Sequence, residues 1–385
     1  MMPDSLFESR ANIKVIGVGG GGCNAVNRMI ASRVLGVTFV AMNTDAQALS
    51  VSKAAVRMQL GERLTCGLGS GGDPSVGEAA ARESIALIEQ VVGDADMVFV
   101  TAGMGGGTGT GAAHIVAETA KKKGVLTIGV VTKPFSFEGK KRQRLADEGA
   151  AALAESVDTL ITVPNDRLVE TVDRKATMSQ AFLQADDVLR AGVQGISEII
   201  LTPGLINVDF ADVKSVMTNA GVALMGLGYA RGENRAKIAA EGAANSPLLE
   251  TNIEGARRLL VNISSGPDFT LAEAHEAMEY LMQFTHPDDA DIIMGHVVRH
   301  ELQDAVQITL LAAGMHAKET HYRPAIRTTL EAAPVAKPTE PIYESPRPLG
   351  LAEMLGSDES ELEPVVANVP NLDIPTFLRQ QRGRR

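Results

Sequence analysis

The sequence has few of the cysteines that stabilise small secreted proteins, and it has no apolar run long enough to span a membrane. It contains no tryptophan, 4% aromatic residues and only two cysteines, Cys23 and Cys66, among 385 residues. Two cysteines cannot form a disulfide framework, which is typical of a reducing compartment. No run approaches the roughly 18 continuous apolar residues of a spanning helix, and the acidic first ten residues lack the apolar segment of a secretory signal. We therefore expect a cytoplasmic protein with no direct membrane span.

Positive charge is also scarce. The chain has 36 Lys and Arg against 47 Asp and Glu, which gives a net charge of -11. An acidic chain binds polyanions poorly, so we expect no nucleic-acid partner. The charge is still compatible with one phosphorylated ligand, because a phosphate group needs only local donors.

Proline and glycine divide the sequence into two parts. Nine of the 17 prolines but only three of the 38 glycines lie from Pro324 onward. The residues after 316 are rich in Pro, Glu, Ser and Thr, and this composition buries too little apolar area to fold. We predict a disordered linker over 317–370. The final segment, 371–385, places apolar side chains beside four arginines and is predicted to bind a partner, with a frayed terminus as the alternative.

Short β-branched runs alternate with helical segments through the first 200 residues. The pattern predicts strands over Ile13–Val18, Val37–Met42, Met97–Thr101, Leu126–Val131 and Thr159–Val163. Helices are expected between several of them, as at Val76–Val92 and Thr110–Lys123. Such alternation indicates a parallel sheet with helices on both faces.

A long periodic stretch follows, from Met178 to Leu201, and predicts one continuous helix that ends at Pro203-Gly204. Gly192 and Gly195 weaken this prediction, because each costs about 1 kcal/mol against alanine in a helix. An interior glycine can be retained where another element packs very close. Further strands are expected at Val222–Leu227, Arg258–Ile263, Ile292–Val297 and Gln307–Leu311. The long helix therefore reads as a connection between two α/β units.

Three glycine-rich segments each separate an expected strand from an expected helix. Gly17–Gly22 satisfies GxGxxG, with Asp45 23 residues beyond it, and alone suggests a nicotinamide-dinucleotide enzyme. A second loop, Gly103–Gly111, adds the hydroxyls of Thr108 and Thr110, and a third lies at Gly67–Gly72. Loops that follow parallel strands converge at one sheet edge, where they can hold one polyphosphate. No GxxxxGK[ST] occurs, so phosphate charge must be met by amides, helix dipoles and a metal.

These loops also carry a family resemblance. GMGGGTGTG at 103–111 resembles the tubulin signature loop GGGTGTG(S/G). Together with GVGGGGCNAVNRMI at 17–30, NTDAQAL at 43–49 and NVDFADVKSVM at 207–217, it makes the chain resemble the FtsZ family of bacterial tubulin-like cell-division GTPases. The resemblance covers nearly all of 12–316 and resumes at DIPTFLRQQ, 373–381.

The resemblance implies a tubulin/FtsZ-like α/β fold, in which a parallel-sheet GTP-binding domain is joined by a central helix to a smaller α/β domain. The implied division is a flexible N-terminus at 1–11, a GTP-binding domain at 12–177, a spine helix at 178–202, a synergy loop and its following helix at 203–220, a C-terminal α/β domain at 221–316, the disordered linker at 317–370 and a partner-binding peptide at 371–385.

The resemblance also implies the residues that hold GTP or GDP, with Mg²⁺ expected beside the nucleotide. The phosphate contacts would come from Gly20, Gly21, Gly22, Cys23, Asn24, Gly71, Gly72, Gly107, Thr108 and Gly109. Glu138 and Arg142 match ribose-side positions, and Asn165, Phe182 and Asp186 match positions around guanine. A carboxylate at Asp186 can accept from guanine N1–H and N2–H₂, which adenine cannot offer. Without the resemblance, Phe182 would read as ordinary core packing.

The candidate catalytic acids, Asp209 and Asp212, lie beyond the far end of the predicted helix. A helix of 24 residues spans roughly 36 Å, too far for these acids to reach the phosphates of their own molecule. A lone Asp209 would read as a helix cap. The resemblance instead implies a synergy loop that enters the nucleotide site of the next subunit, where both acids, with Asn207 nearby, polarise the attacking water. Such a head-to-tail contact generates a filament.

The implied partners are therefore the protein itself and, through the terminal peptide, membrane-tethering and regulatory division proteins. The peptide residues concerned are Asp373, Ile374, Pro375, Phe377 and Leu378. The expected location is a ring beneath the membrane at midcell. Two other classes, a dinucleotide-dependent oxidoreductase and a nucleotide-binding regulator that never polymerises, fit the glycine loops and the acids less well. His296 and His300 suggest a metal pair, but no third ligand is evident.

Overall fold

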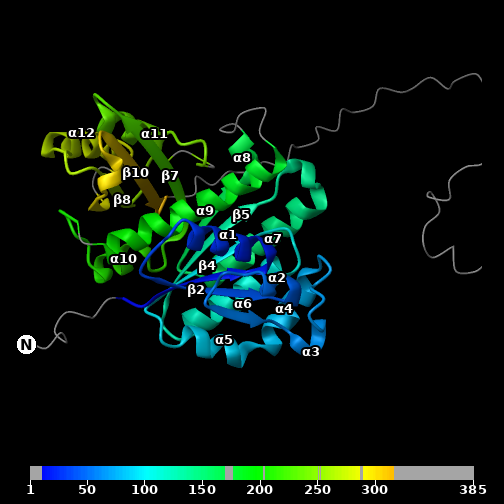
Figure 1. Cartoon of the computed structure of the whole chain (residues 1–385). Coiled ribbons are helices and arrows are strands. Elements are labelled where there is room, and N and C mark those ends of the chain that lie inside the picture. Colours follow the sequence, from blue (N-terminus) through cyan, green and yellow to red (C-terminus); the bar gives the residue numbers. More distant parts are fainter. Residues whose placement is uncertain are drawn as a thin grey trace, which may run out of the picture. The chain divides into compact units, whose positions relative to one another are not determined.

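A computed structural model describes residues 11–169, 177–202, 204–249, 251, 253–286 and 289–315 (Figure 1). The predicted linker and the terminal peptide, with its proposed partner-binding residues, lie outside the described residues. Within the described ranges, no helix combines the length and the apolar character needed to cross a membrane.

The described strands form one hydrogen-bonded order, β3-β2-β1-β4-β5-β6-β7-β10-β8-β9. Their bounds are β1 Ile13–Val18, β2 Val37–Asn43, β3 Val56–Gln59, β4 Met97–Gly103, β5 Leu126–Lys133, β6 Thr159–Pro164, β7 Gly221–Arg231, β8 Arg258–Ser265, β9 Asp291–Val298 and β10 Ala305–Ala313. Strands β1 to β6 are parallel. Strand β7 joins the two halves, because its first three residues pair in parallel with β6 and the rest pairs antiparallel with β10.

The helices lie between these strands in the chain. Their bounds are α1 Gly19–Ala31, α2 Ala46–Ser50, α3 Glu62–Thr65, α4 Pro74–Glu83, α5 Ile85–Val92, α6 Thr108–Lys122, α7 Lys140–Ser156, α8 Asn165–Val169, α9 Met178–Leu201, α10 Phe210–Met217, α11 Arg235–Ala244 and α12 Leu271–Met282, with short 3₁₀ turns η1 Ser136–Glu138 and η2 His300–Leu302. The helix predicted over Met178–Leu201 is confirmed at both ends, and its start is fixed by a capping box of Thr177 and Gln180.

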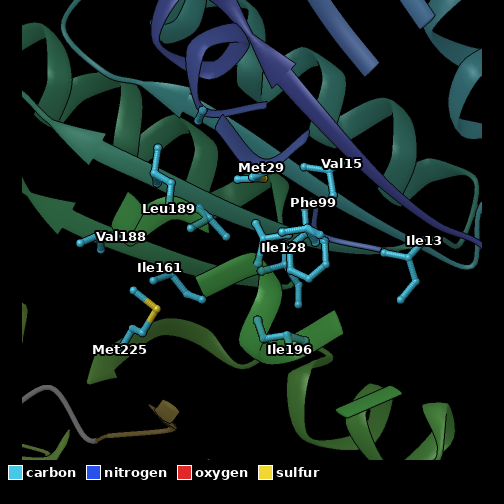
Figure 2. Packing of buried hydrophobic residues seen from close by; sticks show 14 of the residues in the cluster. Ile13, Val15, Met29, Phe99, Ile128, Ile161, Val188, Leu189, Ile196 and Met225 are labelled. Carbon is cyan, nitrogen blue, oxygen red and sulfur yellow. The ribbon is translucent and has the colours of Figure 1, made fainter. Parts of the chain in front are cut away.

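The parallel sheet is buried on both faces, as the apolar strands predict. Along β4, Phe99 packs into the core beneath α1 and α9, and Val98 and Val100 pack into the core beneath α5 and α6. Figure 2 shows the first of these cores, where Phe99 and Ile128 lie among side chains from α1 and α9. This core continues into the C-terminal strands, so α9 belongs to both halves of the molecule.

The two glycines inside α9 have a packing reason. A Cβ on Gly192 would lie 2.9 Å from the sulfur of Met225, and one on Gly195 would lie 2.6 Å from a methyl of Thr309. Both partners belong to strands of the C-terminal half, β7 and β10. The expectation that another element packs very close to these glycines is therefore confirmed.

Two features of the parallel sheet and its helices differ from what the sequence predicts. The helix expected over Val76–Val92 is broken at Ser84, whose hydroxyl accepts a hydrogen bond from the Gly61 N–H at 2.9 Å. Strand β3 was not expected, because its four residues are half-buried or exposed and show no continuous apolar run.

Candidate functional site

The three glycine-rich loops meet beyond the carboxyl ends of the parallel strands. The Thr108 hydroxyl of the second loop lies 2.7 Å from the Thr44 hydroxyl at the end of β2 and 3.0 Å from the Ser70 hydroxyl of the third loop. A Cβ on Gly21 of the first loop would lie 3.1 Å from the backbone of Gly103. The predicted convergence at one sheet edge is thus confirmed.

Many of these glycines are required for the protein's own packing. A Cβ on Gly109 would lie 2.7 Å from the Gly103 carbonyl oxygen, and one on Gly77 of α4 would lie 2.5 Å from that of Gly107. Gly71 and Gly72 have φ values of 61° and 77°, which favour glycine whatever the space around them. Their presence is explained without any ligand.

Two glycines, Gly20 and Gly106, have neither explanation. Neither has a left-handed φ, and a Cβ on either would meet no atom within 4 Å. Among the glycines of the described ranges they alone combine these two properties. Both line the same cavity, so the missing side chains leave room for something other than the protein.

Two helices begin, without a capping side chain, at the cavity lined by Gly20 and Gly106. Helix α1 begins after Val18 and α6 after Gly107, and neither start has a side-chain cap or an acidic residue in its first turn. The neighbouring helix α4, by contrast, is capped by Asp73. Uncapped N–H groups together with the helix dipole form a binding site for anionic oxygens.

A cavity of about 480 Å³ lies in front of these N-termini. Of the predicted nucleotide contacts, it brings together Gly20, Gly21, Asn24, Gly107, Thr108, Gly109, Glu138, Arg142, Asn165, Phe182 and Asp186. Its lining also includes residues that the sequence reading did not assign to binding: Ser70, Gly103, Met104, Gly106, Thr132, Pro134, Ala185 and Leu189. Several follow the carboxyl ends of β4 and β5, a position that could have identified them.

Four predicted contacts do not line the cavity. Gly22 is buried where α1 crosses the end of β4, and Gly71 and Gly72 are exposed beside Ser70, which takes their place in the lining. Cys23 is also absent from the lining: its side chain is buried in the core and its thiol lies 3.6 Å from the Gly17 carbonyl oxygen, so only its backbone is left to contact a nucleotide. Burial raises the pKa of Cys23 to about 12, so the thiol stays protonated.

Part of the cavity lining fits a planar ligand. Phe182 is 43% exposed and packs edge-on against Phe135, with ring centroids 5.5 Å apart. The Asn165 side-chain oxygen is buried and has no hydrogen-bond partner within the described structure. An exposed ring and an unpaired amide oxygen in one cavity fit a base that stacks and donates hydrogen bonds.

Asp186 follows Phe182 by one turn of α9 and lies in the same lining. Burial raises the pKa of Asp186 to about 6; the nearby Arg28 opposes this and the Asp187 carboxylate adds to it. A buried carboxylate that is costly to keep ionised gains most from a ligand with two N–H donors.

A salt bridge orders the side of the cavity between its two ends. The Glu138 carboxylate accepts from Arg142 at 2.5 Å and from the Phe135 N–H at 2.9 Å. Both side chains line the cavity, where the carboxylate can accept from ligand hydroxyls.

The candidate acids lie at the opposite end of α9 from Phe182 and Asp186. Asp209 caps α10 by accepting from the Asp212 N–H at 2.8 Å, so the cap predicted for a lone acid is present. Asn207 accepts from the Gly204 N–H at 2.6 Å. All three side chains are exposed, and none lines the cavity of its own chain.

The histidine pair has no metal-binding geometry. His296 is buried and its Nε2 lies 2.7 Å from the Ser265 hydroxyl. Within the described residues, no group of three or more His, Cys, Asp or Glu side chains could hold a metal ion.

Comparisons with known proteins agree with this geometry. Residues 12–173 match the GTPase domain of the Tubulin/FtsZ family, and residues 221–316 match the C-terminal domain of the FtsZ family. The chain is 45% identical to an FtsZ dimer from M. jannaschii solved empty, with 80% of this chain and 90% of that chain covered and a TM-score of 0.77. A mutant of M. jannaschii FtsZ matches at 45% identity, 80% and 92% coverage and a TM-score of 0.76. GDP-bound CetZ1 from Haloferax volcanii, at 21% identity, 80% and 95% coverage and a TM-score of 0.69, shows the fold alone.

The two open glycines test whether the cavity holds GTP, the nucleotide that the resemblance implies. Gly20→Ala and Gly106→Ala should weaken GTP binding by at least about tenfold, because each methyl group fills space reserved for the ligand. Gly20 lies inside α1, where alanine is favoured over glycine by up to ~1 kcal/mol, so that variant should not lose stability. Nucleotide titration and thermal unfolding measure the two effects. Gly242→Ala in α11, where the Cβ would make only an ordinary contact at 3.4 Å, is the matched control. Wild-type affinity in both cavity variants would exclude this cavity as the site.

Asp186 should make GTP affinity depend on pH. Guanine donors bind the ionised carboxylate, so affinity should fall as the pH falls through about 6, where Asp186 of the free protein takes up a proton. Asp186→Asn should bind at least about tenfold more weakly at neutral pH, because a charge-assisted acceptor is lost. Calorimetric titrations of GTP into the wild type and into Asp186→Asn across this pH range measure the effect. The GTP phosphates titrate equally in both experiments, so a difference between the two pH profiles comes from Asp186. Identical pH profiles would show that Asp186 does not read the base.

Proposed function

The chain belongs to the FtsZ family of tubulin-like GTPases, and from this premise we propose that its subunits assemble head to tail, with hydrolysis of each GTP completed by the loop of the adjacent subunit. GTP binding and hydrolysis follow from the GTPase domain itself. The proposal concerns where the hydrolytic groups come from and what the assembly does.

One observation carries the proposal: within the described residues, Asp209 and Asp212 lie apart from the cavity of their own chain. Among the described residues, the cavity lining supplies amides, hydroxyls and one arginine, and its carboxylates are Glu138 and Asp186. Glu138 is engaged by Arg142 and Asp186 lies at the base end, so neither is placed to polarise a water at the terminal phosphate. Asp209 and Asp212 are exposed at the other end of a 24-residue helix, which spans roughly 36 Å.

Apolar side chains lie exposed near both ends. Phe137, which stacks on Phe135 at 5.0 Å beside the cavity, is 60% exposed. Leu205 in the acid-bearing loop and Leu271 at the start of α12 are 75% and 85% exposed. Two different surfaces that both expose large apolar groups fit a heterologous contact, which propagates into a filament when it does not close. The M. jannaschii FtsZ relative was solved as a dimer, which supports self-association.

In this proposal each part of the chain has a separate task. The N-termini of α1 and α6 bind the phosphates, and Asn165, Phe182 and Asp186 bind guanine. Asp209 and Asp212 of the next subunit hold the attacking water in line with the terminal phosphate, and Asn207 fixes the turn that presents them. Phosphoryl transfer depends mostly on positioning and on charge stabilisation, so completing the site at a subunit contact is sufficient.

Mg²⁺ is expected to accompany the nucleotide. The described chain offers neutral oxygens at the phosphate end, the Ser70 and Thr108 hydroxyls, and no carboxylate cluster. This donor set fits a Mg²⁺ ion held chiefly by the phosphates and water, as is usual for this ion. The bound ion would neutralise phosphate charge, which the described lining of this acidic chain meets with one arginine.

We further propose that the filaments form the ring at the bacterial division site, beneath the membrane in the cytoplasm. The sequence of 371–385, with apolar anchors and four arginines, supports docking to membrane-tethering and regulatory division proteins. Family membership is the ground for both statements.

Hydrolysis in trans makes GTPase activity depend on assembly. The rate per molecule should rise cooperatively with protein concentration, and Asp212→Ala should bind GTP and assemble but hydrolyse at least about 100-fold more slowly. Asp212 is the cleaner choice, because replacing Asp209 also removes a helix cap worth ~1 kcal/mol. Phosphate release and sedimentation over a dilution series measure both quantities. A rate strictly proportional to protein at every dilution would rule out the trans mechanism.

A further inference from the structure

The loop that carries the acids rests on β9. The Ile206 carbonyl oxygen accepts from the His296 N–H at 3.0 Å, which forms an isolated bridge between loop and strand. At Gly204 the two backbones approach so closely that a Cβ would overlap the His296 carbonyl oxygen. The loop is therefore fixed at two points to one residue of the strand.

A second contact lies one residue earlier in β9. A Cβ on Gly295 would lie 3.4 Å from a methyl of Val208 and 3.2 Å from the Ile199 side chain. Val208 is buried although the residues on either side of it are exposed. The absent side chain of Gly295 thus lets the loop and the last turns of α9 pack on the same spot of the strand.

The strand residue that holds the loop is itself immobilised. The His296 ring is buried, hydrogen-bonded to the Ser265 hydroxyl of β8 at 2.7 Å, and stacked on Phe269 with ring centroids 5.0 Å apart. Strand β9 is also fastened to α9, because Arg299, just after the strand, forms an ion pair with Glu198. The Arg299 N–H donates to the Ser265 carbonyl oxygen at 2.8 Å.

We propose that this seat, formed by Gly204, Ile206 and Val208 of the loop on Gly295 and His296 of β9, positions the acids for hydrolysis in the neighbouring subunit. Asp209 follows Val208 directly and starts α10, so any shift of the loop on the seat moves both acids. Gly204 and His296 are positioning residues, and Arg299 with Glu198 holds the seat against α9. This inference rests on the proposed function in trans.

Gly204→Ala tests the seat with a single methyl group. The overlap with the His296 carbonyl oxygen forces the loop to move, and a displacement of about 1 Å at a catalytic group can cost 10²-fold in rate. We expect phosphate release per polymerised subunit to fall at least tenfold with unchanged GTP affinity, and thermal unfolding measures how much stability the displaced loop costs. Polymer is quantified by sedimentation, with GMPPCP as the nucleotide for assembly without turnover. Gly242→Ala is again the matched control.

Arg299→Ala is the second variant and leaves the loop sequence intact. It should lower kcat per polymerised subunit without changing the KM for GTP, and Arg299→Lys, which keeps the positive charge, should recover most of the loss. If Gly204→Ala and Arg299→Ala both keep the wild-type kcat while Asp212→Ala is inactive, the positioning role of the seat is wrong. Hydrolysis in trans would stand in that case. Full activity of Asp212→Ala would instead overturn hydrolysis in trans. Equal losses of GTP affinity and kcat would show that the seat is merely structural.

Discussion

The length and rigidity of α9 are the constraint on which the rest of the structure depends. The helix carries the base-reading side chains Phe182 and Asp186 near its start and delivers the chain to the acid-bearing loop at its end. It packs on the strands of both halves, with Gly192 and Gly195 admitting the C-terminal strands to close contact. Because one stiff element separates the cavity from the exposed Asp209 and Asp212, the proposed mechanism needs two subunits to complete the site.

Glycine serves two purposes in the phosphate-binding half, and the structure separates them. At Gly77 and Gly109 it lets backbones cross, so substitution there would disturb the fold. At Gly20 and Gly106 it leaves open space in front of uncapped helix starts, so substitution there would disturb only the ligand. An acidic chain without a P-loop lysine can therefore bind a polyphosphate, because its donors are main-chain N–H groups placed by packing.

Much of the fold and of the site could be predicted from the sequence, because periodicity and loop position carry local information. The helix over Met178–Leu201 and the meeting of the glycine loops are examples. The break at Ser84 could not be predicted, since it depends on a hydrogen bond to Gly61 across the fold. The burial of the Cys23 side chain could not be predicted either, because a motif gives positions along the chain and not the direction of a side chain. The seat of the loop on His296 had no sequence signal, since it is formed by backbone atoms far apart in the chain.

The central claim is that pocket and acids come from different subunits, and mixing two impaired variants, at a GTP concentration that does not saturate Gly20→Ala, tests it most directly. Asp212→Ala keeps the cavity and lacks an acid, whereas Gly20→Ala keeps the acids and has a filled cavity. The account predicts that equal amounts of the two, assayed for phosphate release with GTP, hydrolyse faster than the sum of the separate variants, because an Asp212→Ala cavity then meets an intact loop. A mixture no faster than that sum, while both variants still co-sediment, would contradict it.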